Sequence, residues 1–185
     1  MKKLLPLLLS FFLLLSLTNL NAQCSSGPPC IPDCPNDPFS AYQTIDVAIA
    51  PGCTLRITYA SRTACGIYSD YYLAGVEIRS FQNCPFAASD VKDIVEYAFA
   101  ALLDVNPVGF PPMPPGPSCN TNWRAGKGAC WEQAGDCMVP CTPLTCCLNS
   151  YTVCIDAGGN KTITPTGVIG PPPGSCTGTC IDVCN

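Results

Sequence analysis

Hydrophobic and polar side chains alternate along the first half of the chain. Residues 42–50 and residues 53–59 each place an apolar side chain at every second position, with Pro51-Gly52 as a turn signal between them. This pattern predicts an antiparallel hairpin with one buried face. Apolar residues at every second position of 72–78 predict a third strand. Residues 60–71, which contain Cys65-Gly66, are expected to form a loop.

A helical period follows the strands. The apolar side chains that recur at helical spacing are Val91, Ile94, Val95, Ala98 and Leu102. Ser89-Asp90 supplies an N-cap and Asp93 adds a negative charge in the first turn, so we expect a helix that ends near Leu103. Its apolar stripe can cover the apolar face of the three strands. Residues 23–104 are therefore predicted to form a disulfide-linked α+β unit, with residues 23–40 as an irregular arm.

The pattern becomes irregular after residue 104. Residues 105–118 are a Pro-rich linker, for which polyproline II is the natural conformation, either as a stiff spacer or as a loop lying on the surface. Residues 119–185 are predicted to form a loop-rich, cysteine-dense unit. Its clearest hairpin joins residues 150–156 to residues 161–164, and Trp123 and Trp131 are expected on short strands. The fold class is thus small, disulfide-rich and mainly β with one helix.

The first 22 residues are predicted to be a signal peptide. Met1-Lys2-Lys3 precedes an uncharged run over residues 4–17, and the small residue Ala22 comes before the expected cleavage site. The basic start is typical of bacteria. A transmembrane anchor needs about 20 apolar residues, and this run is shorter and contains Pro6. Lipidation of Cys24 is an alternative, although Gln23 fits poorly before a lipidated cysteine.

Cysteines are the most informative residues of the predicted mature chain. There are sixteen: Cys24, Cys30, Cys34, Cys53, Cys65, Cys84, Cys119, Cys130, Cys137, Cys141, Cys146, Cys147, Cys154, Cys176, Cys180 and Cys184. An even, dense set in an exported protein predicts disulfides rather than a thiolate metal centre, and no C-x-x-C redox motif is present.

The grouping of the cysteines constrains the pairing. Six lie before the Pro-rich linker and ten after it, so parity permits two separately closed halves. Neighbours in an extended segment point to opposite faces, so Cys146 and Cys147 should bond different partners. Cys176, Cys180 and Cys184 should tie an irregular tail down at intervals.

Catalytic chemistry is sparse. The chain has no histidine, which excludes Ser-His-Asp and Cys-His nucleophile pairs, and its net charge of -4 argues against nucleic acid as the main partner. Residues 126–128 (Gly-Lys-Gly) lack the spacing of a phosphate-binding loop. A hydrolase with two carboxylates stays open. Its candidate acids are Asp46, Asp70, Glu77, Glu132 and Asp136. The alternative is that these carboxylates are solvated groups on the surface.

Aromatic residues give the remaining candidates for binding. Tyr68, Tyr71 and Tyr72 cluster near one predicted loop, and Trp123 and Trp131 flank a Gly-rich turn. Exposed rings on a rigid frame bind proteins or glycans, whereas the alternative is that these rings fill a small core. The sequence favours a non-catalytic module without cofactor or metal, located in the periplasm or at the cell surface. It is expected to bind an envelope or extracellular protein or glycan, and a structural subunit of a surface assembly is the other alternative.

Overall fold

The predicted three-strand antiparallel unit is present in the computed structural model, which describes residues 24–25, 27–31, 33–112, 117–142, 145–172 and 174–184. β1 (Gln43–Ala50) and β2 (Cys53–Ala64) pair across Pro51-Gly52, and β3 (Tyr68–Phe81) pairs antiparallel with β2. The turn contains Gly52 at a φ of +83°, which glycine adopts without strain. The predicted signal peptide at 1–22 lies outside the described residues.

The connection between β2 and β3 is much shorter than the predicted loop at 60–71. Pairing continues to Ala64 opposite Tyr68, so only residues 65–67 form the turn. The arm at 24–40 lies against this part of the sheet, and Arg62 and Asp70 are buried beneath it. A strand that is covered on both faces shows no alternation, and its buried polar residues resemble a loop in the sequence.

Gly75 shows how closely the arm approaches the sheet. A Cβ atom on Gly75 would lie 1.4 Å from the carbonyl oxygen of Cys24. Only a residue without a side chain fits there, so the arm lies directly on the backbone of β3. The sulfur of Cys24 bonds to Cys137 and is therefore not available for a lipid.

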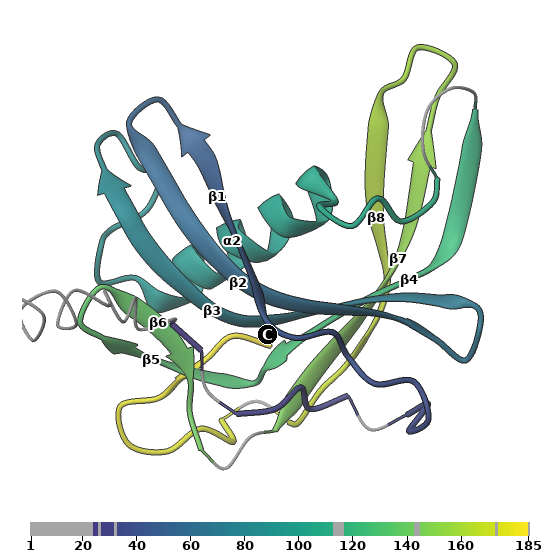
Figure 1. Cartoon of the computed structure of the whole chain (residues 1–185). Helices are drawn as coiled ribbons and strands as arrows, with labels where there is room; N and C mark the ends of the chain where they lie inside the picture. The colour runs from purple at the N-terminus through teal and green to yellow at the C-terminus, as the bar shows by residue number, and fades with distance from the viewer. Residues whose placement is uncertain are drawn as a thin grey trace, which may run out of the picture.

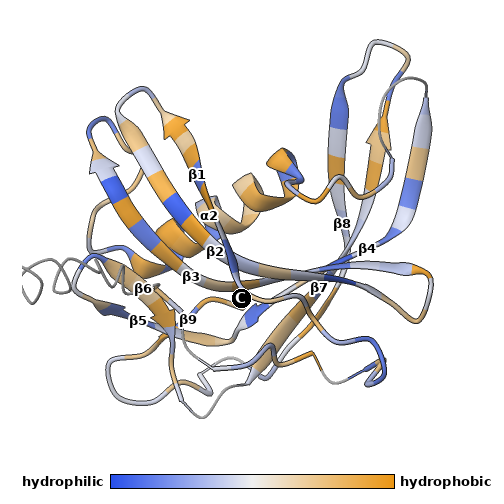
Figure 2. Cartoon of the chain, viewed as in Figure 1, coloured by the Kyte–Doolittle hydropathy of each residue, from blue (hydrophilic) through white to orange (hydrophobic). Residues whose placement is uncertain are grey.

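The predicted helix is confirmed as α2 (Val91–Val105). The carboxylate of Asp90 caps its start by accepting a hydrogen bond from the backbone N–H of Asp93 at 3.1 Å. Asn106 ends it in the left-handed conformation and donates its N–H to the carbonyl of Leu102. The buried side chains of α2 pack on the sheet. Figure 2 shows that the helix is largely apolar. Within the described ranges, no helix is long and apolar enough to cross a membrane.

The C-terminal part contains more strand than the loop-rich prediction. Its strands are β4 (Ser118–Gly128), β5 (Cys130–Ala134), β6 (Cys137–Pro140), β7 (Cys146–Ile155), β8 (Lys161–Ile169) and β9 (Ile181–Asp182). The hairpin of β7 and β8 is confirmed. The other long strand, β4, is rich in Asn and Gly, which have a weak propensity for β-structure. Its pairing with β3 on one side and β7 on the other outweighs this weak strand propensity.

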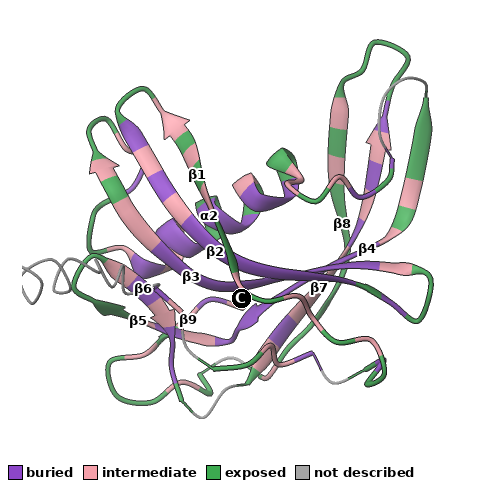
Figure 3. Cartoon of the chain, viewed as in Figure 1, coloured by how far each residue is buried: buried purple, intermediate pink, exposed green. Residues whose placement is uncertain are grey.

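The strands form one sheet that branches at β3. Its order is β8-β7-β4-β3-β6-β5-β9, and β2 with β1 also joins at β3. Residues 69–73 of β3 pair in parallel with β4, whereas residues 76–77 pair with β6. Figure 1 shows the resulting two wings, β1–β3 and β4–β7–β8, with α2 between them. The central stretches of β2 and β3 are buried (Figure 3).

All sixteen cysteines are in disulfides. The pairs are 24–137, 30–146, 34–65, 53–84, 119–154, 130–176, 141–180 and 147–184. Cys146 and Cys147 have different partners and the tail is tied at three points, as predicted. The disulfides do not close within two separate halves, which parity permits, because Cys24 and Cys30 of the arm bond to cysteines of the C-terminal part. The two predicted units share one sheet and two disulfides, and their division into domains stays a prediction.

Candidate functional site

Four of the five candidate aromatic residues have no exposed surface. Tyr71, Tyr72, Trp123 and Trp131 are each 0% exposed. The ring of Tyr71 packs edge-on against Phe110 with centroids 5.0 Å apart. Tyr71 and Tyr72 are neighbours on β3 and point to opposite faces, where Tyr71 packs with Phe110 and Tyr72 contacts Phe39 of the arm. Their burial agrees with the core alternative. Among these five candidates, only Tyr68 keeps part of its ring accessible, and it is half-buried.

The Pro-rich connection lies on this aromatic core where it is described. The ring of Phe110 is buried there, and the carbonyl of Pro111 accepts hydrogen bonds from Trp123 Nε1 and from Asn120 Nδ2. This matches the surface-loop alternative for its described residues.

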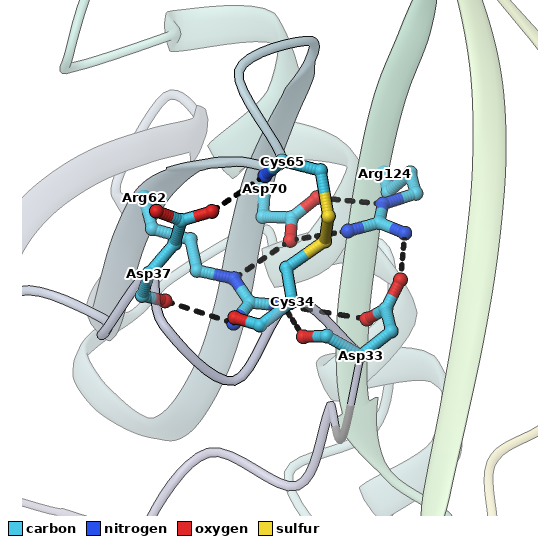
Figure 4. Close-up of a disulfide and its surroundings, with 7 residues drawn as sticks. All are labelled: Asp33, Cys34, Asp37, Arg62, Cys65, Asp70 and Arg124. Atoms are coloured by element: carbon cyan, nitrogen blue, oxygen red, sulfur yellow. Dashed lines mark hydrogen bonds and ion pairs between the residues drawn. A yellow bond between two sulfur atoms is a disulfide. The ribbon is translucent and has the colours of Figure 1, made fainter.

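A buried ionic cluster lies between the arm and the sheet (Figure 4). Asp70, which is 0% exposed, accepts from Arg62 Nε at 2.9 Å and from Arg124 Nε and Nη2, both at 2.7 Å. Both guanidinium groups also contact Asp33 of the arm. Two positive charges thus meet two negative charges, and the cluster attaches the arm to β2, β3 and β4.

Aromatic rings and a disulfide cover the two arginines of this cluster, whereas Asp33 stays half exposed. Arg124 lies 3.8 Å from the ring centroid of Tyr68, and Arg62 lies 4.3 Å from that of Phe39. The Cys34–Cys65 disulfide joins the arm to the turn after β2 in the same place. Every charged group of the cluster has a partner, and these contacts join the arm to the sheet.

Four of the candidate carboxylates have side-chain partners, and Asp46 and Glu77 lie together at Arg56, which contacts both. Asp70 is held by the two arginines. Arg56 Nε donates to Asp46 at 2.7 Å, which lowers the pKa of Asp46, and Arg79 Nη1 donates to Glu77 at 2.6 Å. Thr179 Oγ1 donates to Glu132 at 3.3 Å. At the fifth acid, Asp136, the backbone carbonyl accepts a hydrogen bond from the N–H of Ile78 at 3.1 Å.

Two side-chain clusters in the described part of the chain have the composition of a metal site. They are Cys34, Asp37 and Cys65, and Glu132, Cys141 and Cys180. In both, the two sulfur atoms are bonded to each other and offer no thiolate. A single carboxylate remains in each, which is a weak donor set for a metal ion.

A cavity of about 410 Å³ lies between α2 and the wing formed by β4, β7 and β8. The residues that line it are Glu96, Phe99, Ala100, Leu103, Lys127, Asn149, Tyr151, Ile163, Pro165, Val183 and Cys184. Its rim includes exposed Glu96, Ala100 and Pro165, and its floor is buried. Cys119–Cys154 joins β4 to β7 and Cys147–Cys184 joins β7 to the tail, so disulfides connect the strands and the tail around the cavity.

Lys127 on the floor of this cavity is the exceptional residue. In β4 it follows Trp123 and Ala125 on the face toward α2, a row that otherwise holds buried apolar side chains. Lys127 is 4% exposed, and its Nζ lies 5.0 Å from the ring centroid of Phe99. No described residue accepts a hydrogen bond from this Nζ or forms an ion pair with it. Burial lowers the pKa of Lys127 to about 8.

A second polar group without a partner lies beside Lys127. Asn149 on β7 stands opposite Ala125, one step along the same face from Lys127. Its Nδ2 donates to the hydroxyl of Tyr151 at 3.1 Å, whereas its Oδ1 is buried and accepts no hydrogen bond from the described residues. Burial also raises the pKa of Tyr151, so its hydroxyl stays protonated. The cavity therefore presents an unused donor and an unused acceptor above an apolar floor.

Another cavity, of about 510 Å³, lies on the opposite face of the same wing. It is lined by Cys30, Ile31, Asp33, Thr145, Cys146, Leu148, Ile169 and Pro171. Asp33, the charged residue among the described ones that line it, already pairs with both arginines of the ionic cluster. This cavity is larger, but its described lining holds no buried polar side-chain atom without a partner, so the cavity over Lys127 is the better candidate site.

In the sequence, Lys127 stands out only as part of an incomplete phosphate loop. The available signal was the alternation of Trp123, Ala125 and Lys127, in which a lysine takes an inward position. That signal needs the strand and its covered face to be known first. Comparisons with protein-family models, with curated proteins and with solved structures find no match to the chain, so the site is assigned from its own geometry.

Proposed function

We propose that the chain is an exported, non-catalytic binding module of the cell envelope or extracellular space, and that a ligand from that environment enters the cavity over Lys127. The observation that carries this proposal is the buried amine of Lys127, which faces a cavity and has no acceptor. Desolvation of a charged amine opposes folding, and a bound acceptor would offset that cost.

The disulfides support both the location and the mode of action. Eight disulfides are typical of proteins from oxidising compartments, which is compatible with export. They also hold the walls of the cavity in place before a ligand arrives, which lowers the entropic cost of binding. The alternative hydrolase finds less support, because the candidate acids do not line the cavity.

Site-specific photo-crosslinking in the native host tests this function. A photoreactive amino acid replaces Ala100 on the exposed rim, and the matched control replaces Ala157 in the exposed turn between β7 and β8. We expect a discrete adduct at position 100 that is absent at position 157. Equal yields at the two positions, or no adduct at position 100, would contradict a ligand in the cavity.

A further inference from the structure

Resting on the function proposed above, we propose that the cavity binds an amphipathic carboxylate that carries a hydroxyl or amide N–H next to its acid group. The carboxylate accepts from Lys127 Nζ, the neighbouring donor meets Asn149 Oδ1, and the apolar part lies along Phe99 and Leu103. This assignment follows from three observations on the site: one charge, one acceptor and one apolar surface.

The charge points to an anion. Lys127 is 4% exposed and its Nζ, a strong donor, faces the cavity, and the described acids near it do not reach it as ion pairs. The charged groups that act on it are Glu96 and Lys92 of α2 and Asp182 of β9, with effects of opposite sign. A carboxylate against Nζ would form a charge-assisted hydrogen bond in a low dielectric, where such bonds are strongest.

The acceptor distinguishes a substituted acid from a simple one. Asn149 Oδ1 is buried and unused, and a carboxylate alone cannot donate to it. Because Asn149 and Lys127 are diagonal neighbours on adjacent strands, one small head group can reach both. A hydroxyl or an amide N–H close to the acid group supplies the missing donor.

The apolar floor determines the rest of the ligand. Phe99, Leu103 and Val183 are at most 5% exposed and line the cavity together with Ile163. A volume of about 410 Å³ is at the lower end of small-molecule sites, which favours a short alkyl chain or a single ring over an oligosaccharide.

Calorimetric titration of the oxidised protein at pH 7 with 3-hydroxydecanoate tests the proposal. Decanoate lacks the hydroxyl and 1,3-decanediol lacks the acid, so both are expected to bind more weakly than the probe. Lys127→Met should weaken binding of the probe by roughly 10- to 100-fold, since it removes a charged hydrogen-bond donor. Lys161→Met removes a half-buried lysine of β8 that pairs with Asp104 outside the cavity lining, so it is the matched control and should leave the affinity unchanged.

The pH dependence gives a second readout. Only the protonated amine attracts the ionised carboxylate, so the affinity should be constant between about pH 6 and pH 8 and fall by about tenfold per pH unit above it. In Lys127→Met this fall should disappear. A merely structural role of Lys127 would not produce such a slope.

Other results overturn the proposal in distinguishable ways. Equal affinity of the probe for the wild type and Lys127→Met, or equal affinity of the diol and the hydroxy acid, rejects the carboxylate at Lys127. If none of these probes binds while position 100 still cross-links in the host, the ligand class is wrong and the proposed function stands. If both experiments are negative, the function and the ligand class fail together.

Discussion

Removal of the buried charge of Asp70 should destabilise the fold strongly. In Asp70→Asn, the two arginines lose their common counter-ion and three hydrogen bonds of 2.7–2.9 Å are weakened. Asp33 is half exposed and cannot neutralise both guanidinium groups alone. Breaking a buried ion pair from one side costs about 3–5 kcal/mol, because the other charge stays in the interior. For a chain of this size the unfolding midpoint should fall by roughly 6–20 °C.

Thermal unfolding of the oxidised protein, followed by circular dichroism, measures this effect. Asp46→Asn is the matched control, since it removes one acid from the exposed Asp46–Arg56 pair on β1 and β2. Exposed pairs contribute little, so the midpoint of the control should stay close to that of the wild type. A midpoint for Asp70→Asn no lower than that of the control would refute the role assigned to the ionic cluster.

Three more perturbations test the fold and the site. Gly75→Ala forces a Cβ into the backbone of Cys24 and should lower the free energy of unfolding by about 1–3 kcal/mol, as measured in urea. The control is Gly167→Ala, whose added Cβ meets no atom within 4 Å and should not change stability. Equal effects of the two substitutions would contradict the packing of the arm on β3. Excess reductant should abolish the native circular dichroism spectrum, because each disulfide contributes roughly 2–4 kcal/mol to a net stability of about 5–15 kcal/mol; a native-like spectrum would contradict this. The pKa of Lys127 is lowered from 10.5 to about 8, so protonation costs the folded state about 3 kcal/mol below pH 8 and nothing above pH 10.5. Lys127→Met should therefore be more stable than the wild type at pH 7, and this difference in the free energy of unfolding should disappear by pH 10.5. A difference that does not change with pH would refute the burial of a charged amine at Lys127.

Sequence patterns predicted the elements that have one buried face. In the hairpin around Pro51-Gly52, apolar and polar side chains alternate because one face of the hairpin packs on α2. The helix has a clear N-cap at Asp90 and one apolar stripe, which packs on the sheet. The different partners of Cys146 and Cys147 followed from strand geometry alone. In each case, local geometry and the target of the apolar face point to the same structure.

The features that sequence patterns missed depend on contacts between distant segments. The ends of β2 and β3 were predicted as loop because the arm covers their second face and buries Arg62 and Asp70 there. The pairing of β3 with β4 brings together residues about fifty positions apart, and no local pattern specifies it. The cavity over Lys127 forms only when α2, β4 and β7 meet, so a lysine between two glycines gave no sign of it.

The titration of Lys127 tests the central claim most directly. Heteronuclear NMR can follow the lysine ε-CH₂ signals with pH, and Lys127→Met identifies the signal that belongs to this residue. The account predicts a midpoint of about 8 for Lys127, since the amine is buried in the cavity without an acceptor. A midpoint at the ordinary value of 10.5 would show a solvated or already paired amine and would contradict the site.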